Sequence, residues 1–265
     1  MKKLAIIFSS FIYSLAAFAD GEELRNMQNH AFQRGEYLEY RVFYDSWMTS
    51  WLTAGVGTVE VTDENKQFHG RDTYHMKIEG KSKGLFNWFF KVRDRFESYV
   101  DEQALVPWKF IRRTREGDFV KDDDVYFDHF KNTAKSRTLE REIPPNTQDI
   151  VSAFYVMRNL SVDSLNVNDE LSVKFLLDDS VYTSRIIFLG RGEVKVKAGK
   201  FKALAFKPKM ATGEVFDEEY PMTIWVSDDR NHIPLRLDSK VIIGSITIEL
   251  TDFRNLKHPL NSKID

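Results

Sequence analysis

A period-two alternation of apolar and polar residues runs along most of this chain, and it limits the possible folds more than any other feature. In residues 38–44 every second side chain is apolar or aromatic, and the side chains between them include Glu39 and Arg41. This pattern is typical of a β-strand that buries one face. Short turn sequences, such as His-Gly-Arg-Asp at 69–72 and Glu-Gly-Asp at 116–118, separate such segments, and short turns suit antiparallel strands. We therefore expect an antiparallel sheet.

The alternating segments continue almost to the end of the chain, and no strand–helix–strand alternation is visible among them. A parallel nucleotide-binding fold is therefore not expected. Besides residues 38–44, the expected strands are 56–61, 74–79, 109–115, 119–127, 134–142, 171–177, 182–189, 193–197, 201–208, 223–227, 234–239 and 241–251.

One helix interrupts the strands. The Pro-Pro pair at 144–145 ends a strand, Asn146 or Thr147 can cap a helix, and Asp149 suits the positive first turn. The apolar residues that follow at helical spacing are Ile150, Phe154, Met157 and Leu160. We expect a helix over 147–160 that lies on the sheet. The expected fold is mainly β: a single strongly curved antiparallel sheet or incomplete β-barrel with one helix packed on its concave side.

The first nineteen residues have the three parts of a secretory signal peptide. Lys2 and Lys3 precede an apolar stretch, and Ala-Phe-Ala at 17–19 forms a small-x-small cleavage site. The apolar stretch is shorter than the roughly 20 residues that span a bilayer. We expect that residues 1–19 are a cleaved signal peptide, that the protein is periplasmic, and that the mature chain, beginning at Asp20, has no transmembrane segment.

The rest of the chain is expected to form one domain, because it contains no internal repeat and no linker rich in Pro, Gly or Ser. Residues 20–34 are polar and unpatterned and are expected to be an N-terminal tether. Residues 35–255 are expected to form a single β-rich domain, and 256–265 a C-terminal tail.

Composition excludes several classes of function. The chain has no Cys, so disulfides, thiolate metal sites, Cys nucleophiles and the acyl anchor of a bacterial lipoprotein are excluded. Its 38 basic and 40 acidic residues nearly balance, which argues against nucleic acid as a partner. The six His show no zinc-binding spacing, and no nucleophile elbow or glycine-rich phosphate loop is present. We therefore name no catalytic or metal-binding residue and expect no cofactor.

The densest group of aromatic residues predicts a ligand site. Rings can contact the apolar part of an amphipathic ligand, while guanidinium groups bind a carboxylate or phosphate. The candidate ligand-binding residues are Leu85, Phe86, Trp88, Phe89, Phe90, Arg93, Asp94 and Arg95, with Asp94 orienting the two arginines. The alternative is that the aromatics fill a wide core. A one-residue shift of register moves each side chain to the other face, so the pattern leaves open which face 93–95 occupy.

Four separated motifs resemble, in the right order, the bacterial domain-of-unknown-function 3108 family. They lie at 88–99, 115–117, 144–155 and 224–235, within a match from about Gly35 to Phe253. The resemblance implies an exported, mostly β envelope protein of Gram-negative bacteria, and it brings no established catalytic residues.

A second resemblance concerns one hairpin. Trp-Val-Ser-Asp-Asp at 225–229, followed by Pro234 and Leu235, is similar to a hairpin of periplasmic Lol-type lipoprotein carriers. In those carriers a half-barrel covered by helices encloses an acyl-binding cavity. They contain more helix than the pattern predicts here, and fold analogy alone does not establish function.

These expectations lead to three functional hypotheses. The first is non-enzymatic binding of an amphipathic envelope ligand, such as a lipid, an acyl chain or a glycolipid, in an aromatic-lined concavity. The second is a structural or assembly partner of a cell-envelope protein complex. The third is a polysaccharide-active enzyme that uses two strand-borne carboxylates. The sequence favours the first.

Overall fold

The computed structural model describes residues 24–46, 49–210 and 218–264 of the chain. The predicted signal peptide, 1–19, lies outside the described residues. The described strands are β1 (Tyr37–Ser46), β2 (Thr49–Val61), β3 (Gln67–Phe68), β4 (Arg71–Ser82), β5 (Arg93–Asp101), β6 (Pro107–Glu116), β7 (Phe119–Asp128), β8 (Thr133–Lys135), β9 (Glu140–Glu142), β10 (Glu170–Leu177), β11 (Ser180–Val196), β12 (Gly199–Pro208), β13 (Met222–Ser227), β14 (Pro234–Lys240) and β15 (Ser245–Arg254). The helices are α1 (Phe86–Phe89) and α2 (Ile150–Arg158).

All of these strands belong to one antiparallel sheet. Its order is β10-β11-β12-β13-β14-β15-β1-β2-β4-β5-β6-β7-β8-β9, with the short β3 paired to β4 alone. Because β10 and β9 end the path without pairing with each other, the sheet is not closed into a barrel. The expected fold, a curved antiparallel sheet with a helix on its concave side, is confirmed; α1 is an additional short helix.

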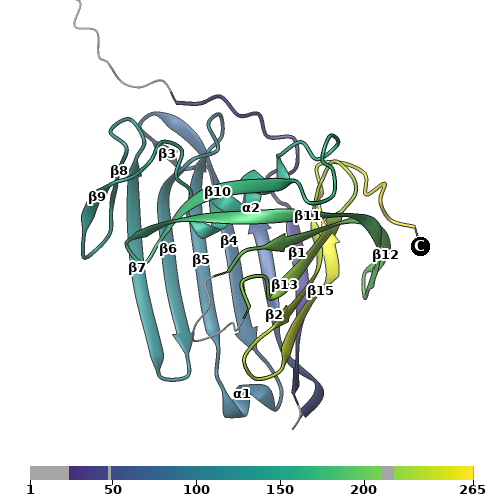
Figure 1. Cartoon of the computed structure of the whole chain (residues 1–265). Coiled ribbons are helices and arrows are strands. Elements are labelled where there is room, and N and C mark those ends of the chain that lie inside the picture. The colour runs from purple at the N-terminus through teal and green to yellow at the C-terminus, as the bar shows by residue number, and fades with distance from the viewer. Residues whose placement is uncertain (1–23, 47–48, 211–217, 265) are drawn as a thin grey trace, which may run out of the picture.

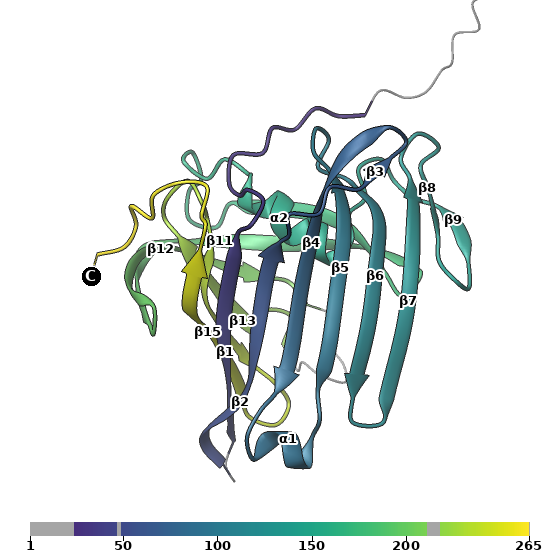
Figure 2. The same ribbon diagram turned by 180° about the vertical axis from the view of Figure 1, so that it is seen from behind.

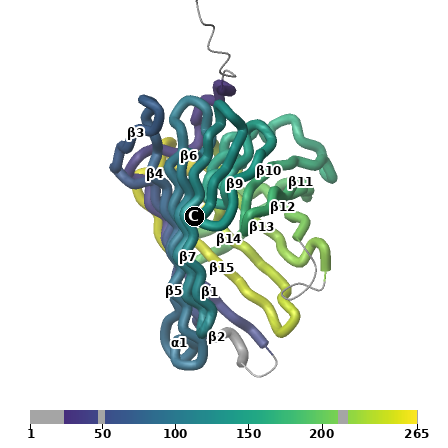
Figure 3. Tube along the Cα trace, turned by 90° about the vertical axis from the view of Figure 1, so that its left-hand side faces the viewer, coloured from purple at the N-terminus to yellow at the C-terminus, as the bar shows by residue number. Residues whose placement is uncertain are grey.

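The sheet bends so strongly that its two halves face each other. Strands β1, β2 and β4 to β7 form one wall of long, nearly aligned strands, with α1 at their lower end (Figure 2). Strands β12 to β15 form the other wall, and the two walls diverge toward the end where α1 lies (Figure 3). The β10–β11 hairpin crosses in front of the first wall, and α2 lies behind this hairpin (Figure 1).

Helix α2 begins three residues later than the sequence predicts. Its N-cap is Asp149, whose carboxylate accepts hydrogen bonds from the backbone N–H groups of Val151 and Ser152. The preceding residue, Gln148, pairs with β10: its N–H donates to the carbonyl of Lys174. A residue bound to a strand in this way is extended, and the helix therefore begins only after it.

Both faces of α2 are apolar, and each contacts something different. Val151 and Tyr155 are fully buried in the core, together with residues of the first wall. Ile150, Phe154 and Met157, the stripe predicted from helical spacing, are half-buried and face the space between the walls. The helix therefore closes one end of the sheet with one side and lines the interior with the other. Neither of the helices in the described part of the chain is long and apolar enough to cross a membrane.

The two terminal segments pack on the fold, where the sequence predicts a tether and a tail. Phe32 is fully buried and contacts the rings of Tyr74 and Tyr155 edge-on, at centroid distances of 5.2 and 4.8 Å. At the other terminus, the Ser262 hydroxyl donates to the carboxylate of Asp229 at 2.6 Å. The carbonyl of Ser262 accepts a hydrogen bond from the N–H of Lys202 in β12. The described residues of both segments are therefore parts of the domain.

Candidate ligand-binding cavity

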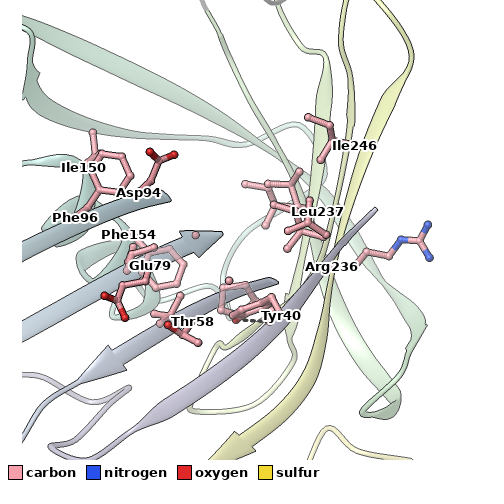
Figure 4. Close-up of a pocket in the computed structure, with 18 of the residues that line it drawn as sticks. Tyr40, Thr58, Glu79, Asp94, Phe96, Ile150, Phe154, Arg236, Leu237 and Ile246 are labelled. Atoms are coloured by element: carbon pink, nitrogen blue, oxygen red, sulfur yellow. Dashed lines mark hydrogen bonds between the residues drawn. The ribbon is translucent and has the colours of Figure 1, made fainter. Parts of the chain in front are cut away.

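A cavity of about 790 Å³ lies between the two walls. Cavities that bind small molecules usually measure about 300–1,000 Å³ and are mostly apolar. The apolar side chains that line this one come from both walls, from α2 and from the β10–β11 hairpin (Figure 4). They include Tyr40, Val42, Tyr44, Ile78, Phe96, Ile150, Phe154, Met157, Leu171, Val173, Phe175, Ile186, Phe206, Ile224, Leu237, Ile246 and Ile248.

The floor of the cavity carries glycine where neighbouring strand positions carry side chains. The register aligns Tyr40, Gly57, Gly80 and Asp94 in one row across β1, β2, β4 and β5, so all four share the concave face. A Cβ atom added at Gly80 would meet no atom within 4 Å, and one at Gly57 only a carbonyl oxygen at 3.5 Å. Neither glycine has a positive φ. Backbone conformation and close packing therefore do not require glycine at these two positions, and its effect is to leave the interior open.

At a third position, Gly55, close packing of the backbone requires glycine. A Cβ atom there would lie 2.5 Å from the carbonyl oxygen of Lys81, so the close approach of β2 and β4 excludes any side chain. In strands, glycine often marks a close approach of another backbone or of a ligand. Gly55 fits the first case, whereas Gly57 and Gly80 face open space.

Most of the charged residues around the cavity turn their side chains away from it. Arg236 points outward (Figure 4), where it forms an ion pair with Asp238 at 2.7 Å. Glu79 lies on the convex face of β4, paired with Lys77 at 3.3 Å. Asp94 is the exception, because its register places it on the concave face beside Phe96. The interior is therefore apolar, with one carboxylate at its edge.

Asp94 interacts with a second carboxyl group, that of Glu116 on β6. One Asp94 oxygen accepts a hydrogen bond from the backbone N–H of Arg115 at 3.0 Å. Burial raises the pKa of Glu116, and its hydrogen bond to Asp94 and the Asp94 charge raise it further. Glycosidases need room between their two carboxyls for a sugar and, in inverting enzymes, a water. Two carboxyl groups that hydrogen-bond to each other leave no room for a sugar between them. The Asp94–Glu116 pair therefore does not favour the enzyme hypothesis.

The α2 end of the cavity is closed by a buried ion pair. Arg158, the last residue of α2, contacts Glu36 through two hydrogen bonds of 2.6 and 2.9 Å, and both side chains are almost fully buried. The guanidinium also donates to the carbonyl of Asn231 at 3.1 and 3.0 Å. These bonds join the helix to the segment before β1 and to the turn between β13 and β14.

The β10–β11 hairpin forms the front wall, and we call it the strap. Its turn, Asp178-Asp179, reaches the opposite wall: Asp178 pairs with Arg112 at 3.1 Å and with Lys121 at 2.7 Å. Asp179 accepts a hydrogen bond from the hydroxyl of Thr138 at 2.6 Å. The strap thus spans the cavity from one wall to the other and is held at its tip by polar contacts.

The structure separates the eight predicted site residues into three groups. Phe86, Phe90 and Asp94 line the cavity. Leu85, Trp88 and Phe89 lie on the outer surface of the α1 segment and are exposed. Arg93 and Arg95 lie on the convex face of β5, where Arg95 pairs with Glu97 at 2.9 Å. Strand alternation thus places Asp94 opposite the two arginines, and a joint role of all eight residues in binding stays a prediction.

Sequence reasoning missed most of the lining. Three strap residues, Leu171, Val173 and Phe175, alternate with polar residues as in any half-buried strand. No local sequence pattern indicates that they face a cavity. A signal was present at Gly57 and Gly80, two glycines inside otherwise alternating strands. The described residues contain no group of three or more His, Asp or Glu positioned to hold a metal ion.

Comparison with known sequences places the chain in a family. Residues 39–251 match the sequence profile of DUF3108, which is described as a protein of unknown function. The chain belongs to the DUF3108 family. This confirms the resemblance seen in the four motifs, and the match covers every strand of both walls at least in part. No curated protein matches this DUF3108 chain significantly.

Among solved structures, this DUF3108 chain is similar to a β-barrel-like protein of the domain of unknown function DUF1849 from Brucella abortus. The two share 11% identity with a TM-score of 0.55, over 86% of this chain and 100% of that one. A candidate lipoprotein from Parabacteroides distasonis matches with a TM-score of 0.37 and 9% identity, over 87% of this chain and 100% of that one. A candidate exported protein with a YmcC-like fold from Bacteroides fragilis has a TM-score of 0.36 and 12% identity, over 88% and 100%. At 11% identity, the similarity to the Brucella abortus protein shows a shared fold and nothing beyond it.

Proposed function

We propose that this protein binds the apolar part of an amphipathic envelope ligand, such as a lipid, an acyl chain or a glycolipid, without transforming it. The observation that carries the proposal is the open apolar cavity with Gly57 and Gly80 in its floor. Glycine inside a strand costs about 0.5–1 kcal/mol relative to alanine. An interior that keeps two glycines facing free space is suited to an occupant.

The dimensions and chemistry of the cavity narrow the ligand class. A volume of about 790 Å³ exceeds what bound water alone explains, because water needs two to four polar partners at each site and the lining offers few. An elongated apolar chain would bury its surface against both walls and the strap, at about 25 cal/mol per Å² removed from water. Asp94, the carboxylate at the edge of the cavity beside Phe96, would lie next to the polar end of such a ligand. We infer that the export signal predicted at 1–19 brings the protein to the periplasm, where such ligands occur.

Two measurements test the proposal. The first is native mass spectrometry of the protein purified from its own periplasm, followed by denaturing extraction; we expect a released lipid or glycolipid. The second is titration with a dansyl-labelled fatty acid, whose fluorescence rises in apolar surroundings. We expect binding by the wild-type protein and at least a tenfold loss of affinity in Gly80→Leu, because the leucine would project into the centre of the cavity.

The matched control is Lys77→Leu, which adds the same side chain to the same strand on its convex face. This variant should bind the probe as the wild type does. Gly80→Leu should unfold at the same or a higher urea concentration, since it removes a glycine from a strand and its Cβ meets no atom within 4 Å. A folded Gly80→Leu variant that binds the probe with unchanged affinity would rule out the cavity as the binding site.

A further inference from the structure

The segment between β4 and β5, which contains α1, lies at the end of the molecule opposite α2 (Figure 2). It exposes large apolar side chains. Trp88 is 78% exposed and Phe89 67% exposed, and their rings contact each other edge-on at 4.7 Å. Leu85 is exposed beside them. Trp88 and Phe89 are thus not covered by any part of the described chain.

Two hairpin turns at the same end also expose apolar residues. The first residues of β7, just after the β6–β7 turn, expose Phe119 and Val120, and the β14–β15 turn exposes Ile242 and Ile243, the latter to 63%. We call this set the rim: Leu85, Trp88, Phe89, Phe90, Phe119, Val120, Ile242 and Ile243. The rim holds eight of the fourteen exposed large hydrophobic residues found among the described residues, so they gather at one end and are not scattered.

Contacts join the rim into one surface around the cavity mouth. The N–H of Gly117, in the β6–β7 turn, donates to the carbonyl of Lys91 at 2.9 Å. The ring of Tyr44 contacts that of Phe86 at 5.9 Å, and its hydroxyl donates to the carbonyl of Ile243 at 2.7 Å. Tyr44 and Phe86 line the cavity, and so does Phe90, which is 43% exposed. The cavity therefore reaches solvent inside this rim.

The charge of the α1 segment is one-sided. Between Gly80 and Arg93 the chain carries no acidic residue, whereas Lys81, Lys83, Lys91 and Arg93 are all exposed. The whole sequence has slightly more acidic than basic residues, so this stretch departs from the average. Its aromatic tip is flanked by cations on both sides.

We propose that the rim docks on the surface of an anionic lipid bilayer, with the cavity mouth facing the headgroups. Trp and Phe are suited to the boundary between headgroups and acyl chains, and neighbouring Lys and Arg are attracted to anionic lipids. The rim consists of three narrow tips, from the α1 segment and two turns, which can enter between headgroups. Docking needs only this surface, so the inference goes beyond ligand binding and does not depend on it.

The test is flotation of the protein with vesicles of phosphatidylcholine alone and of phosphatidylcholine with phosphatidylglycerol. We expect the wild type to float with the anionic vesicles and much less with the neutral ones. Trp88→Ser/Phe89→Ser should reduce the bound fraction at least tenfold. Lys83→Gln/Lys91→Gln should reduce it on anionic vesicles and should weaken its dependence on salt.

The matched control is Leu139→Ser/Val167→Ser, which removes two exposed apolar side chains from loops outside the rim. This variant should float as the wild type does. Absence of wild-type flotation, or equal losses in the rim and control variants, would overturn the proposal. Crosslinking of the rim in cells to a protein, without vesicle binding in vitro, would overturn it in favour of a protein partner.

Two variants separate docking from ligand binding. Gly80→Leu should lose the fatty-acid probe and still float with anionic vesicles. Ile242→Ser/Ile243→Ser, which changes two rim residues that do not line the cavity, should bind the probe and float less with anionic vesicles than the wild type does. Failure of one prediction therefore leaves the other open to its own test.

Discussion

The two ends of this sheet differ in how they treat polar and apolar groups. At the α2 end, Arg158 and Glu36 are buried and paired, and Asp149 accepts three hydrogen bonds from Ser98, Val151 and Ser152. At the rim end, Trp88 and Phe89 are exposed and the nearby floor carries glycine. The α2 end buries charged groups, which must lose their hydration, whereas the rim end exposes apolar side chains to solvent.

This difference suggests that residues at the α2 end mainly stabilise the fold and that residues at the rim end are available for contacts with other molecules. Buried, mutually satisfied polar groups tolerate little change, because removing one leaves its partner unsatisfied. Exposed apolar side chains add little to folding and can therefore be retained for contacts with other molecules. We expect substitutions at the α2 end to change the free energy of unfolding, and substitutions at the rim end to change binding.

The largest effect should follow from breaking the buried ion pair. Glu36→Gln keeps the shape of the side chain but leaves the Arg158 guanidinium without a counter-charge in a buried site. Removing one partner of a buried pair typically costs about 3–5 kcal/mol. We expect a loss of this size in the free energy of unfolding, measured by urea denaturation, and unchanged vesicle binding under native conditions.

The control for this prediction is an ion pair in water. Lys135 and Glu140 pair at 3.4 Å with both side chains more than half exposed. Glu140→Gln should change the free energy of unfolding by less than about 1 kcal/mol. Equal losses in the two Glu→Gln variants would contradict the contrast between buried and exposed ion pairs.

An intermediate effect should appear in the pH dependence of stability. Burial raises the pKa of Asp149 to about 6 even though Ser98 and two backbone N–H groups donate to it. In the unfolded chain an Asp titrates near 3.9. The folded state therefore holds this proton more tightly, and the Asp149 contribution to the free energy of unfolding increases as pH falls from about 7 to about 4.

Asp149→Asn removes this titration and keeps an N-cap residue. The difference in unfolding free energy between wild type and variant should change by about 2–3 kcal/mol from pH 7 to pH 4, in favour of the wild type at low pH, because one pKa unit corresponds to about 1.4 kcal/mol. Urea denaturation at several pH values measures it. A difference that is flat across this range would show that folding does not raise the pKa of Asp149.

His129 provides a control of opposite sign. Burial lowers its pKa to about 4, despite the hydrogen bond between Nε2 and the carbonyl of Pro107. The unfolded chain, with a His pKa near 6.5, then binds the proton more readily, so this contribution is lost as pH falls from about 6.5 to about 4. His129→Gln should therefore shift the wild-type-minus-variant difference in the direction opposite to Asp149→Asn.

The sequence predicts the local part of this fold well. Alternation over 38–44 and the turns at 69–72 and 116–118 are short-range signals, and they correspond to β1 and to the β3–β4 and β6–β7 turns. The start of α2 was misplaced because Gln148 pairs with β10, more than twenty residues away along the chain. A contact at that distance leaves no local pattern.

The candidate site shows the same limit. Aromatic density pointed to 85–90, and Phe86 and Phe90 do line the cavity. Arg93 and Arg95 lie on the convex face because they alternate along β5 with Asp94 and Phe96, which face the cavity. A one-residue shift of register would reverse the two faces. The strap residues could not be identified, since their position depends on ion pairs between Asp178 and the opposite wall.

The smallest effect on stability should come from loosening the strap, and this prediction joins the two ends. Asp178 pairs with Arg112 and Lys121 while its own side chain is half exposed, so Asp178→Asn should cost at most about 1 kcal/mol of unfolding free energy. The same contacts hold the front wall of the cavity closed.

If the strap must detach for a ligand to leave, about 1 kcal/mol corresponds to about a fivefold faster release. Stopped-flow displacement of the dansyl-labelled fatty acid measures that rate, with Asp128→Asn, which removes an ion pair with Lys131 away from the strap, as the control. Equal release rates in the two variants would mean that the ligand leaves through the rim alone and that the strap is a fixed wall.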